Sequence, residues 1–359
     1  MTTRLRERRR GGEVFCVVIQ KNAVMSGVTT RAQKRRIGER NLWSLIVKCD
    51  DICCTHVLPR LNATDIKFLY GVNKETRALV KRSSRANDLK KGFKVREMLS
   101  ISTLEVAWEN RENKSLWPCS CWDETYFCCH VAGTNKLELL KWIREEEKCK
   151  WNERTINVAA CQGNLEMVKY CVANECPIDE WACKFAAQNG HLECLKYLRE
   201  EAKVPWDFPT ANWAATNGHL HILEYLVERK YDKYDVDACK FAAKYGHLDC
   251  LKYLHETAKA PWDRYTASRA AENGHLHILE YLVERKYDQY NKYACQWAAV
   301  NGHLDCLKYL HETAKAPWDS WAVRDAHENN RTECVQYLLD NNCPIPFRWR
   351  YEHGELHTS

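Results

Sequence analysis

The sequence has no apolar run long enough to cross a membrane. The longest candidate, VFCVVI at residues 14–19, is far shorter than the ~20 residues that a transmembrane helix needs. It is also too short for the core of a secretory signal peptide. Twenty cysteines in a chain without an export signal indicate free thiols in a reducing compartment. We therefore expect a soluble intracellular protein, cytoplasmic or nuclear, that makes no contact with a membrane.

The sequence also lacks the short motifs of common catalytic sites. It has no Gly-rich phosphate loop, no nucleophile elbow, and no acid and base pair that stands outside its general pattern. The acidic run Glu145–Glu147 is typical of a solvated helix end. These absences argue against an enzyme, and we expect no cofactor.

What the chain does contain is a phrase, GHLxxLxYL, that recurs at a fixed distance. A period between 20 and 50 residues indicates a stacked repeat array, in which each unit buries its apolar face on its neighbours. The glycines that open the phrase lie 28 residues apart, at Gly190, Gly218, Gly246, Gly274 and Gly302.

Each unit has the signals of two helices. Each unit has an Asp or Asn seven residues before its Ala-Ala pair, or before the corresponding residues where the pair is incomplete. This residue predicts the N-cap of a first helix, and such a cap stabilises the helix by ~1 kcal/mol. The glycine of the phrase would end that helix in a left-handed conformation. The apolar spacing L-x-x-L-x-Y-L then predicts the second helix. The expected caps are Asn152, Asp179, Asp207, Asp235, Asp263, Asn291 and Asp319.

This helix–turn–helix unit, with xAAxxGHLExLKYL at its centre, resembles the ankyrin repeat. The resemblance covers residues 123–345, about eight units, and implies an all-α, ankyrin-like helical solenoid that binds proteins. The unit is shorter than the usual 33 residues, and the strings WACK, PTAN, DACK, YTAS, YACQ and WAVR replace the Thr-Pro-Leu-His signature. Because the missing residues fall in the loop between units, we expect the β-hairpin finger to be a tight turn.

An internal duplication indicates where a partner would bind. Residues 218–273 and 274–329 are identical at 41 positions, and all 15 differences fall in the loop end and first helix of each unit. This favours a recognition face on the concave side, built from rigid aromatic and polar side chains. The predicted contacts are Lys184, Asn212, Lys240, Ser268, Gln296 and Arg324, flanked by Trp181, Asp237, Tyr265, Tyr293 and Trp321.

The N-terminal third differs from the repeats. Residues 1–40 carry 11 Lys and Arg against 3 Glu, which indicates a nuclear localisation signal, a nucleic-acid-binding arm, an Arg-rich organelle transit peptide or a solvated disordered tail. Residues 41–82 predict three short helices that resemble an F-box, although the opening Leu-Pro is missing and Pro59 interrupts the pattern. Residues 83–100 are expected to be a linker, 101–122 a half repeat that caps the array, and 346–359 a C-terminal tail.

The F-box resemblance implies contacts with the adaptor of a cullin-type ubiquitin ligase; otherwise the module would be a helical cap or accessory domain. The positions that would bind this adaptor are Ile52, Val57, Leu58, Leu61, Ile66 and Leu69.

Two groups of residues suggest a metal site, but the repeat alignment argues against both. Zinc could be held by Cys119, Cys121, Cys128, Cys129 and His130. However, Cys128 aligns with Cys183, Cys239 and Cys295 at a core position. The histidines of the phrase recur once per unit, and stacked helices 8–10 Å apart are too far from one another to share one ion. We expect these histidines to hydrogen-bond the turn between the helices, and we expect no metal.

The favoured function is therefore a non-catalytic scaffold, expected to be monomeric, that binds a partner protein on the concave face of the array. The alternatives are a substrate receptor of a ubiquitin ligase, through residues 41–82, and association with nucleic acid through the basic tail.

Overall fold

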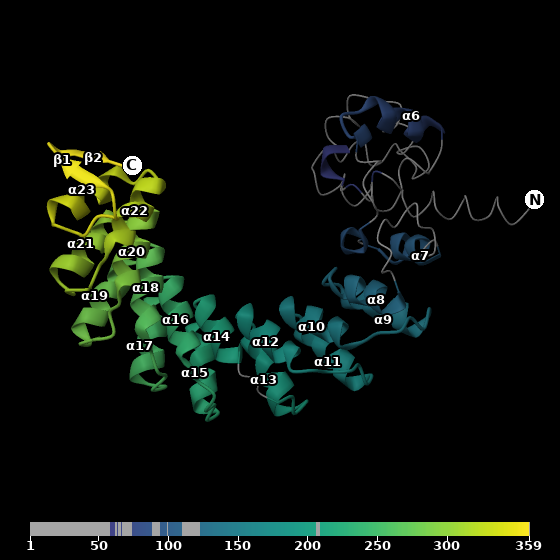
Figure 1. Ribbon diagram of the computed structural model, residues 1–359. Coiled ribbons are helices and arrows are strands. Elements are labelled where there is room, and N and C mark those ends of the chain that lie inside the picture. Colours follow the sequence, from purple (N-terminus) through teal and green to yellow (C-terminus); the bar gives the residue numbers. More distant parts are fainter. Residues whose placement is uncertain are drawn as a thin grey trace, which may run out of the picture. The chain divides into compact units, whose positions relative to one another are not determined.

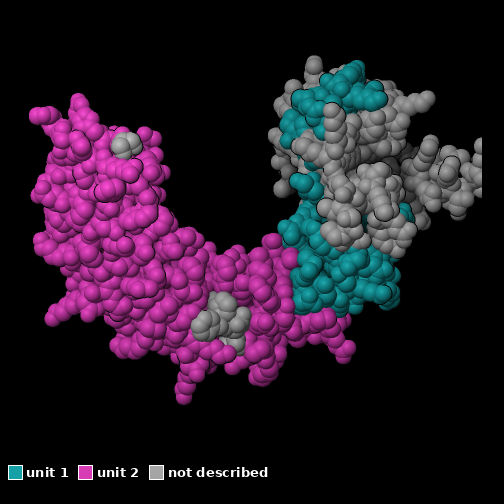
Figure 2. All heavy atoms as spheres, in the orientation of Figure 1, with its two compact units in different colours: residues 1–156 teal, residues 157–359 magenta. Residues whose placement is uncertain are grey.

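The computed structural model describes residues 58–61, 63, 66, 74–87, 94–98, 100–109, 123–205 and 209–358 (Figure 1). The chain divides into two compact units, Met1–Ile156 and Asn157–Ser359 (Figure 2). Helices dominate the described residues, and two short strands form their only sheet. The predicted all-α class is confirmed. No helix in the described ranges is both long and apolar enough to cross a bilayer.

The first unit combines short helical segments with the first helices of the array. Its elements are η2 (Leu58–Arg60), α6 (Lys74–Arg82), η4 (Val95–Glu97), α7 (Ile101–Glu109), α8 (Glu124–Ala132), α9 (Leu137–Glu145) and the start of α10 (Glu153–Cys161). The expected half repeat is the helix α7, whose Trp108 ring lies 5.1 Å from that of Phe127 in α8. The segment expected to be a linker contains η4, and Val95 and Met98 there are buried.

The second unit is built from helix pairs that follow the predicted units. The helices are α11 (Leu165–Ala173), α12 (Trp181–Gln188), α13 (Leu192–Glu200), α14 (Pro209–Thr216), α15 (Leu220–Glu228), α16 (Val236–Lys244), α17 (Leu248–Glu256), α18 (Arg264–Glu272), α19 (Leu276–Glu284), α20 (Lys292–Asn301), α21 (Leu304–Glu312), α22 (Ser320–Glu328) and α23 (Thr332–Asp340).

The two helices of each pair occupy different layers. In Figure 1, the first helices, α12 to α22 by even numbers, lie side by side along the inner side of this unit. The second helices, α13 to α23 by odd numbers, lie on the outer side of the first helices. The Ala-Ala pairs of the first helices are fully buried, because alanine lets a second helix approach closely. No strand interrupts residues 123–205 or 209–345, so the predicted tight turns replace the fingers here.

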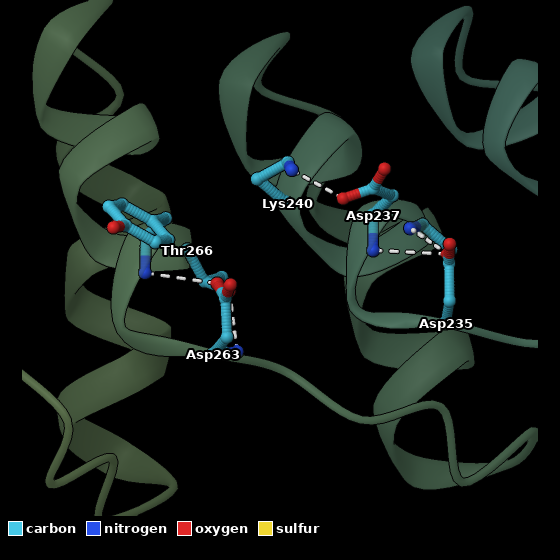
Figure 3. Close-up of polar contacts among 7 residues, drawn as sticks. Asp235, Asp237, Lys240, Asp263 and Thr266 are labelled. Carbon is cyan, nitrogen blue, oxygen red and sulfur yellow. Dashed lines mark hydrogen bonds and ion pairs between the residues drawn. The ribbon is translucent and has the colours of Figure 1, made fainter.

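Side-chain caps start the first helices, as predicted. Asp235 accepts hydrogen bonds from the backbone N–H groups of residues 237 and 238, at 3.1 and 3.3 Å. Asp263 forms a capping box with Thr266 (Figure 3). Asn152, Asp179, Asn291 and Asp319 also accept from the backbone N–H two residues ahead, whereas Asp207 lies outside the described residues.

A glycine and a histidine from successive repeats form the contact between turns. Gly218 has a φ of +74°, which side-chain-bearing residues rarely adopt. A Cβ at this position would lie 2.7 Å from Nδ1 of His247, in the next repeat. The same imidazole donates from Nε2 to the carbonyl oxygen of Thr216, at 3.1 Å. The histidine therefore holds the turn of the preceding repeat rather than its own turn.

This contact recurs along the array. His191, His219 and His275 reach the carbonyl oxygens of Cys161, Gln188 and Lys244 in the same way, at 3.0–3.1 Å. In the last repeat Arg331 replaces the histidine, and its Nε donates to the Val300 carbonyl at 3.1 Å. The predicted structural role of the histidines is confirmed at these positions.

The second helices meet through two kinds of interface that alternate. The hydroxyl of Tyr281 donates to Glu256 of the preceding repeat at 3.0 Å, and Arg285 forms an ion pair with the same carboxylate at 2.7 Å. Two repeats earlier, Tyr225 makes the same contact with Glu200. These tyrosines are buried, whereas Tyr253, in the repeat between them, is half-exposed. The structural period is therefore two repeats.

The expected C-terminal tail includes a β-hairpin. Its strands, β1 (Arg350–Glu352) and β2 (Glu355–His357), pair in antiparallel register. His353 and Gly354 form the two-residue turn with φ values of 53° and 84°, the geometry that right-twisted hairpins prefer. The Tyr351 hydroxyl accepts a hydrogen bond from Gln336 at 3.0 Å, which joins the hairpin to α23.

Candidate protein-binding surface

Each first helix of the second unit turns one face away from its second helix. Counted from the expected cap, the fourth, seventh and eighth residues are buried in α12 to α20; in α22 the fourth and seventh are buried, whereas the eighth, His327, is exposed. The second, sixth and ninth residues lie on the opposite side and are at least partly exposed wherever their side chains are described. Since these positions are three or four residues apart, they form one stripe along the helix. We call this stripe, over α12 to α22, the inner face.

Aromatic side chains occupy the inner face in every one of these six helices. Trp181, Tyr293 and Trp321 are the most exposed, at 44%, 40% and 46%. The others are half-buried, with their rings flanked by the neighbouring helices. We call the whole set the aromatic row: Trp181 and Phe185 in α12, Trp213 in α14, Phe241 in α16, Tyr265 in α18, Tyr293 and Trp297 in α20, and Trp321 in α22.

The predicted polar contacts lie deeper than expected. Lys184, Asn212 and Ser268 occupy the fifth position after the cap and are only 8%, 7% and 2% exposed. Ser268 donates to the Asn291 side chain of the next cap at 2.9 Å. This position faces the neighbouring first helix, so these side chains join repeats and expose little surface to a partner.

The other fifth-position residues are half-buried and also bond within the chain. Lys240 forms an ion pair with Asp237 (Figure 3). Gln296 donates to Asp325 of the next first helix at 2.6 Å. The polar residues predicted as partner contacts thus bond chiefly within the array itself.

Cations lie against several rings of the aromatic row. The Lys184 ammonium is 3.7 Å from the ring centroid of Trp181 and 4.6 Å from that of Trp213. The Arg324 guanidinium is 3.6 Å from the Trp321 centroid. Such cation–π contacts restrict the ring orientations, because moving the ring would lose the attraction. The row is thus held in place before any partner arrives.

Ion pairs neutralise most of the charge near the row. Besides Lys240 and Asp237, Arg269 pairs with Glu272 at 2.6 Å. Further along, Lys292 reaches Asp319 of the next cap at 2.9 Å, and Arg324 reaches Asp325 at 2.7 Å and Glu328 at 3.7 Å. The inner face consequently presents rings between these ion pairs, together with the ammonium group of Lys244.

The sequence prediction missed Phe185, Trp213, Phe241 and Trp297. They stand next to the buried Ala-Ala pair, where an aromatic residue is easily taken for core. The signal that identifies Phe185, Phe241 and Trp297 is their spacing, since each lies four residues after a predicted contact. Trp213 has no such signal, because Pro209 was not among the predicted contacts.

Cysteines of the array are core residues without the character of reactive thiols. Cys183, Cys239 and Cys295 are fully buried, as predicted, and burial raises the pKa of each to about 12. A thiol with such a pKa stays protonated at neutral pH and is a poor nucleophile. In the first unit, Cys128 and Cys129 lie buried in α8, and desolvation lowers the pKa of His130 to about 4. Cys119 and Cys121 lie outside the described residues.

The proposed adaptor-binding residues divide into two groups. Leu58, Leu61 and Ile66 are buried, with exposures of 1%, 3% and 0%. Ile52, Val57 and Leu69 lie outside the described residues.

The comparisons with known proteins agree with the helix pairs. A family model for ankyrin repeats, built from three copies, matches residues 128–207, 185–264, 240–320 and 267–348. These overlapping matches span more than half of the chain. None of the curated proteins matches it.

Proposed function

Since the chain belongs to the ankyrin-repeat family, we propose that it is a protein-binding scaffold whose inner face holds the partner. The observation that carries this proposal is the aromatic row, which places at least one partly exposed ring on each of six consecutive helices. Interface hot spots are rich in Trp and Tyr because these rings bury much apolar area at little cost in conformational entropy.

The rigidity of the surface supports the same function. Side chains cap α12, α16, α18, α20 and α22, and several turns are bonded to the next repeat, so a partner would meet preformed positions. Binding then costs less ordering entropy than it would on flexible loops.

The test compares two half-exposed aromatic residues on opposite layers. Trp213→Ala removes a ring from the aromatic row, whereas Tyr253→Ala removes one from the second helix α17. We expect the full-length Trp213→Ala protein to capture its partners from a cell extract at least ~5-fold less well, as for an interface hot spot. Tyr253→Ala should capture them as the unmodified protein does. Both should retain the circular dichroism of the folded array. Equal loss from both variants would refute the inner face as the binding surface.

The alternative function, a substrate receptor for a cullin-type ubiquitin ligase, would add a second contact through residues 41–82. The burial of Leu58, Leu61 and Ile66 supports a small core in that segment. A pull-down with the ligase adaptor, using the full chain and a chain lacking residues 41–82, tests it directly. The nucleic-acid alternative predicts binding that weakens steeply with salt and disappears when residues 1–40 are deleted.

A further inference from the structure

We propose that the aromatic row binds a proline-rich segment in the polyproline II conformation, with about one peptide turn per repeat. This inference rests on the proposed function and specifies the chemistry of the partner. It is argued from the pitch of the row, from its unused hydrogen-bond donors and from its charge balance.

The pitch of the row matches that of a polyproline II helix. Helices packed side by side are 8–10 Å apart, so the first helices, each with one or two rings at its second or sixth position, recur at that interval. A polyproline II helix has three residues per turn and rises 3.1 Å per residue, or about 9.3 Å per turn. An α-helical partner repeats every 5.4 Å and a β-strand about every 6.8 Å, so neither would stay in register with the rings. Every third residue of the proposed ligand would lie opposite one first helix, which carries a ring at its second or sixth position.

The rings also present the hydrogen-bond donors that such a ligand needs. A polyproline II backbone makes no internal hydrogen bonds, so its carbonyl oxygens are free to accept from a partner. Within the described ranges, the indole N–H groups of Trp181, Trp213, Trp297 and Trp321 donate to no protein atom. An indole can pack its face on a proline ring while its N–H points to a carbonyl, as in other aromatic-lined grooves for proline-rich segments.

The charge of the surface selects against strongly basic ligands. The carboxylates of Asp237, Glu272, Asp319, Asp325 and Glu328 are each paired with a cation of the same chain. A basic peptide would find these carboxylates already paired, and it would lose solvation without gaining a free counter-charge. A proline-rich segment of low charge complements this surface without disturbing it.

Oligoproline peptides of 6, 12 and 18 residues provide the probe. Fluorescence anisotropy with the full-length protein should show affinity rising with length, by at least ~10-fold from 6 to 18 residues as further rings are engaged. A Gly-Ser peptide of 18 residues, of similar charge but flexible, should bind at least ~10-fold more weakly than the oligoproline. Trp213→Ala should weaken binding of the longest oligoproline by at least ~5-fold, and Tyr253→Ala should leave it unchanged.

Two results would overturn the inference. One is an oligoproline that binds no better than the Gly-Ser peptide, and the other is equal weakening by Trp213→Ala and Tyr253→Ala. If capture of protein partners still depends on Trp213 while oligoproline fails to bind, the scaffold function stands and only the polyproline II ligand is wrong. If neither depends on Trp213, both proposals fail.

Discussion

The contact between Gly218 and His247 should make one methyl group unusually costly. Gly218→Ala would place a Cβ 2.7 Å from the His247 ring, at a φ of +74°. The left-handed backbone costs about 1–2 kcal/mol for an L-residue, and forcing a methyl into a packed site costs about 1–3 kcal/mol more. We therefore expect Gly218→Ala to lower the free energy of unfolding by about 2–5 kcal/mol, measured by urea denaturation followed by circular dichroism.

Gly302 offers a matched control in the same turn. Its φ is +80°, but its Cβ would meet the flexible Arg331 side chain at 3.0 Å instead of an imidazole ring. Gly302→Ala should therefore cost about 1–2 kcal/mol, the backbone part alone. Replacing His247 by alanine in the Gly218→Ala protein should relieve the clash, so the double variant should be more stable than the sum of the single effects implies, by at least about 1 kcal/mol.

Either of two outcomes would contradict a steric coupling between Gly218 and the His247 ring. If Gly218→Ala and Gly302→Ala destabilise the protein equally, the imidazole does not limit the space above the turn. If the effects of Gly218→Ala and His247→Ala simply add, the two residues are not coupled. Because a repeat array can unfold in parts, hydrogen exchange at the amides of the turns should accompany the urea curves.

Three further predictions concern the stability of the array. Burial lowers the pKa of His219 and His275, so the unfolded chain takes up protons first as the pH falls below about 6.5. The urea midpoint should therefore drop between pH 7.5 and 5.5, and by less when both histidines are replaced by glutamine. Asp263→Ala removes a helix cap and should cost about 1 kcal/mol in the same urea assay, while Asp263→Asn should cost less. Ser268→Ala breaks the bond to Asn291 and should also cost about 1 kcal/mol, yet leave partner capture unchanged because Ser268 is buried.

The sequence predicted those features that depend on local chemistry. Caps such as Asp235, turns such as the one at Gly218, and core cysteines such as Cys239 each follow from a residue type at a fixed place in the unit. Repetition strengthened each of these inferences, because the same signal recurs in many units. The helix pairs and their order could therefore be deduced without coordinates.

The exposed surface of the first helices was harder to predict because it depends on how closely neighbouring helices pack. Ser268 and Lys184 are polar and look like surface residues, but the adjacent first helix covers them. Trp213 is apolar and looks like core, but its side chain is partly exposed. The hairpin escaped notice because strands of three residues are too short for an alternating pattern, although the His353-Gly354 pair was a usable turn signal.

The alternation of interfaces also bears on how such a gene can change in length. If the gene gained or lost a block of 56 residues, every contact between neighbouring repeats would be of a kind that the array already has. The hydrogen bonds of Tyr225 to Glu200 and of Tyr281 to Glu256 represent this kind of contact. Gain or loss of a single 28-residue unit would set two units of the same kind against each other, a junction absent from residues 218–329. Recombination that preserves the fold should therefore proceed in pairs of repeats, and the aromatic row would lengthen or shorten by two helices at a time.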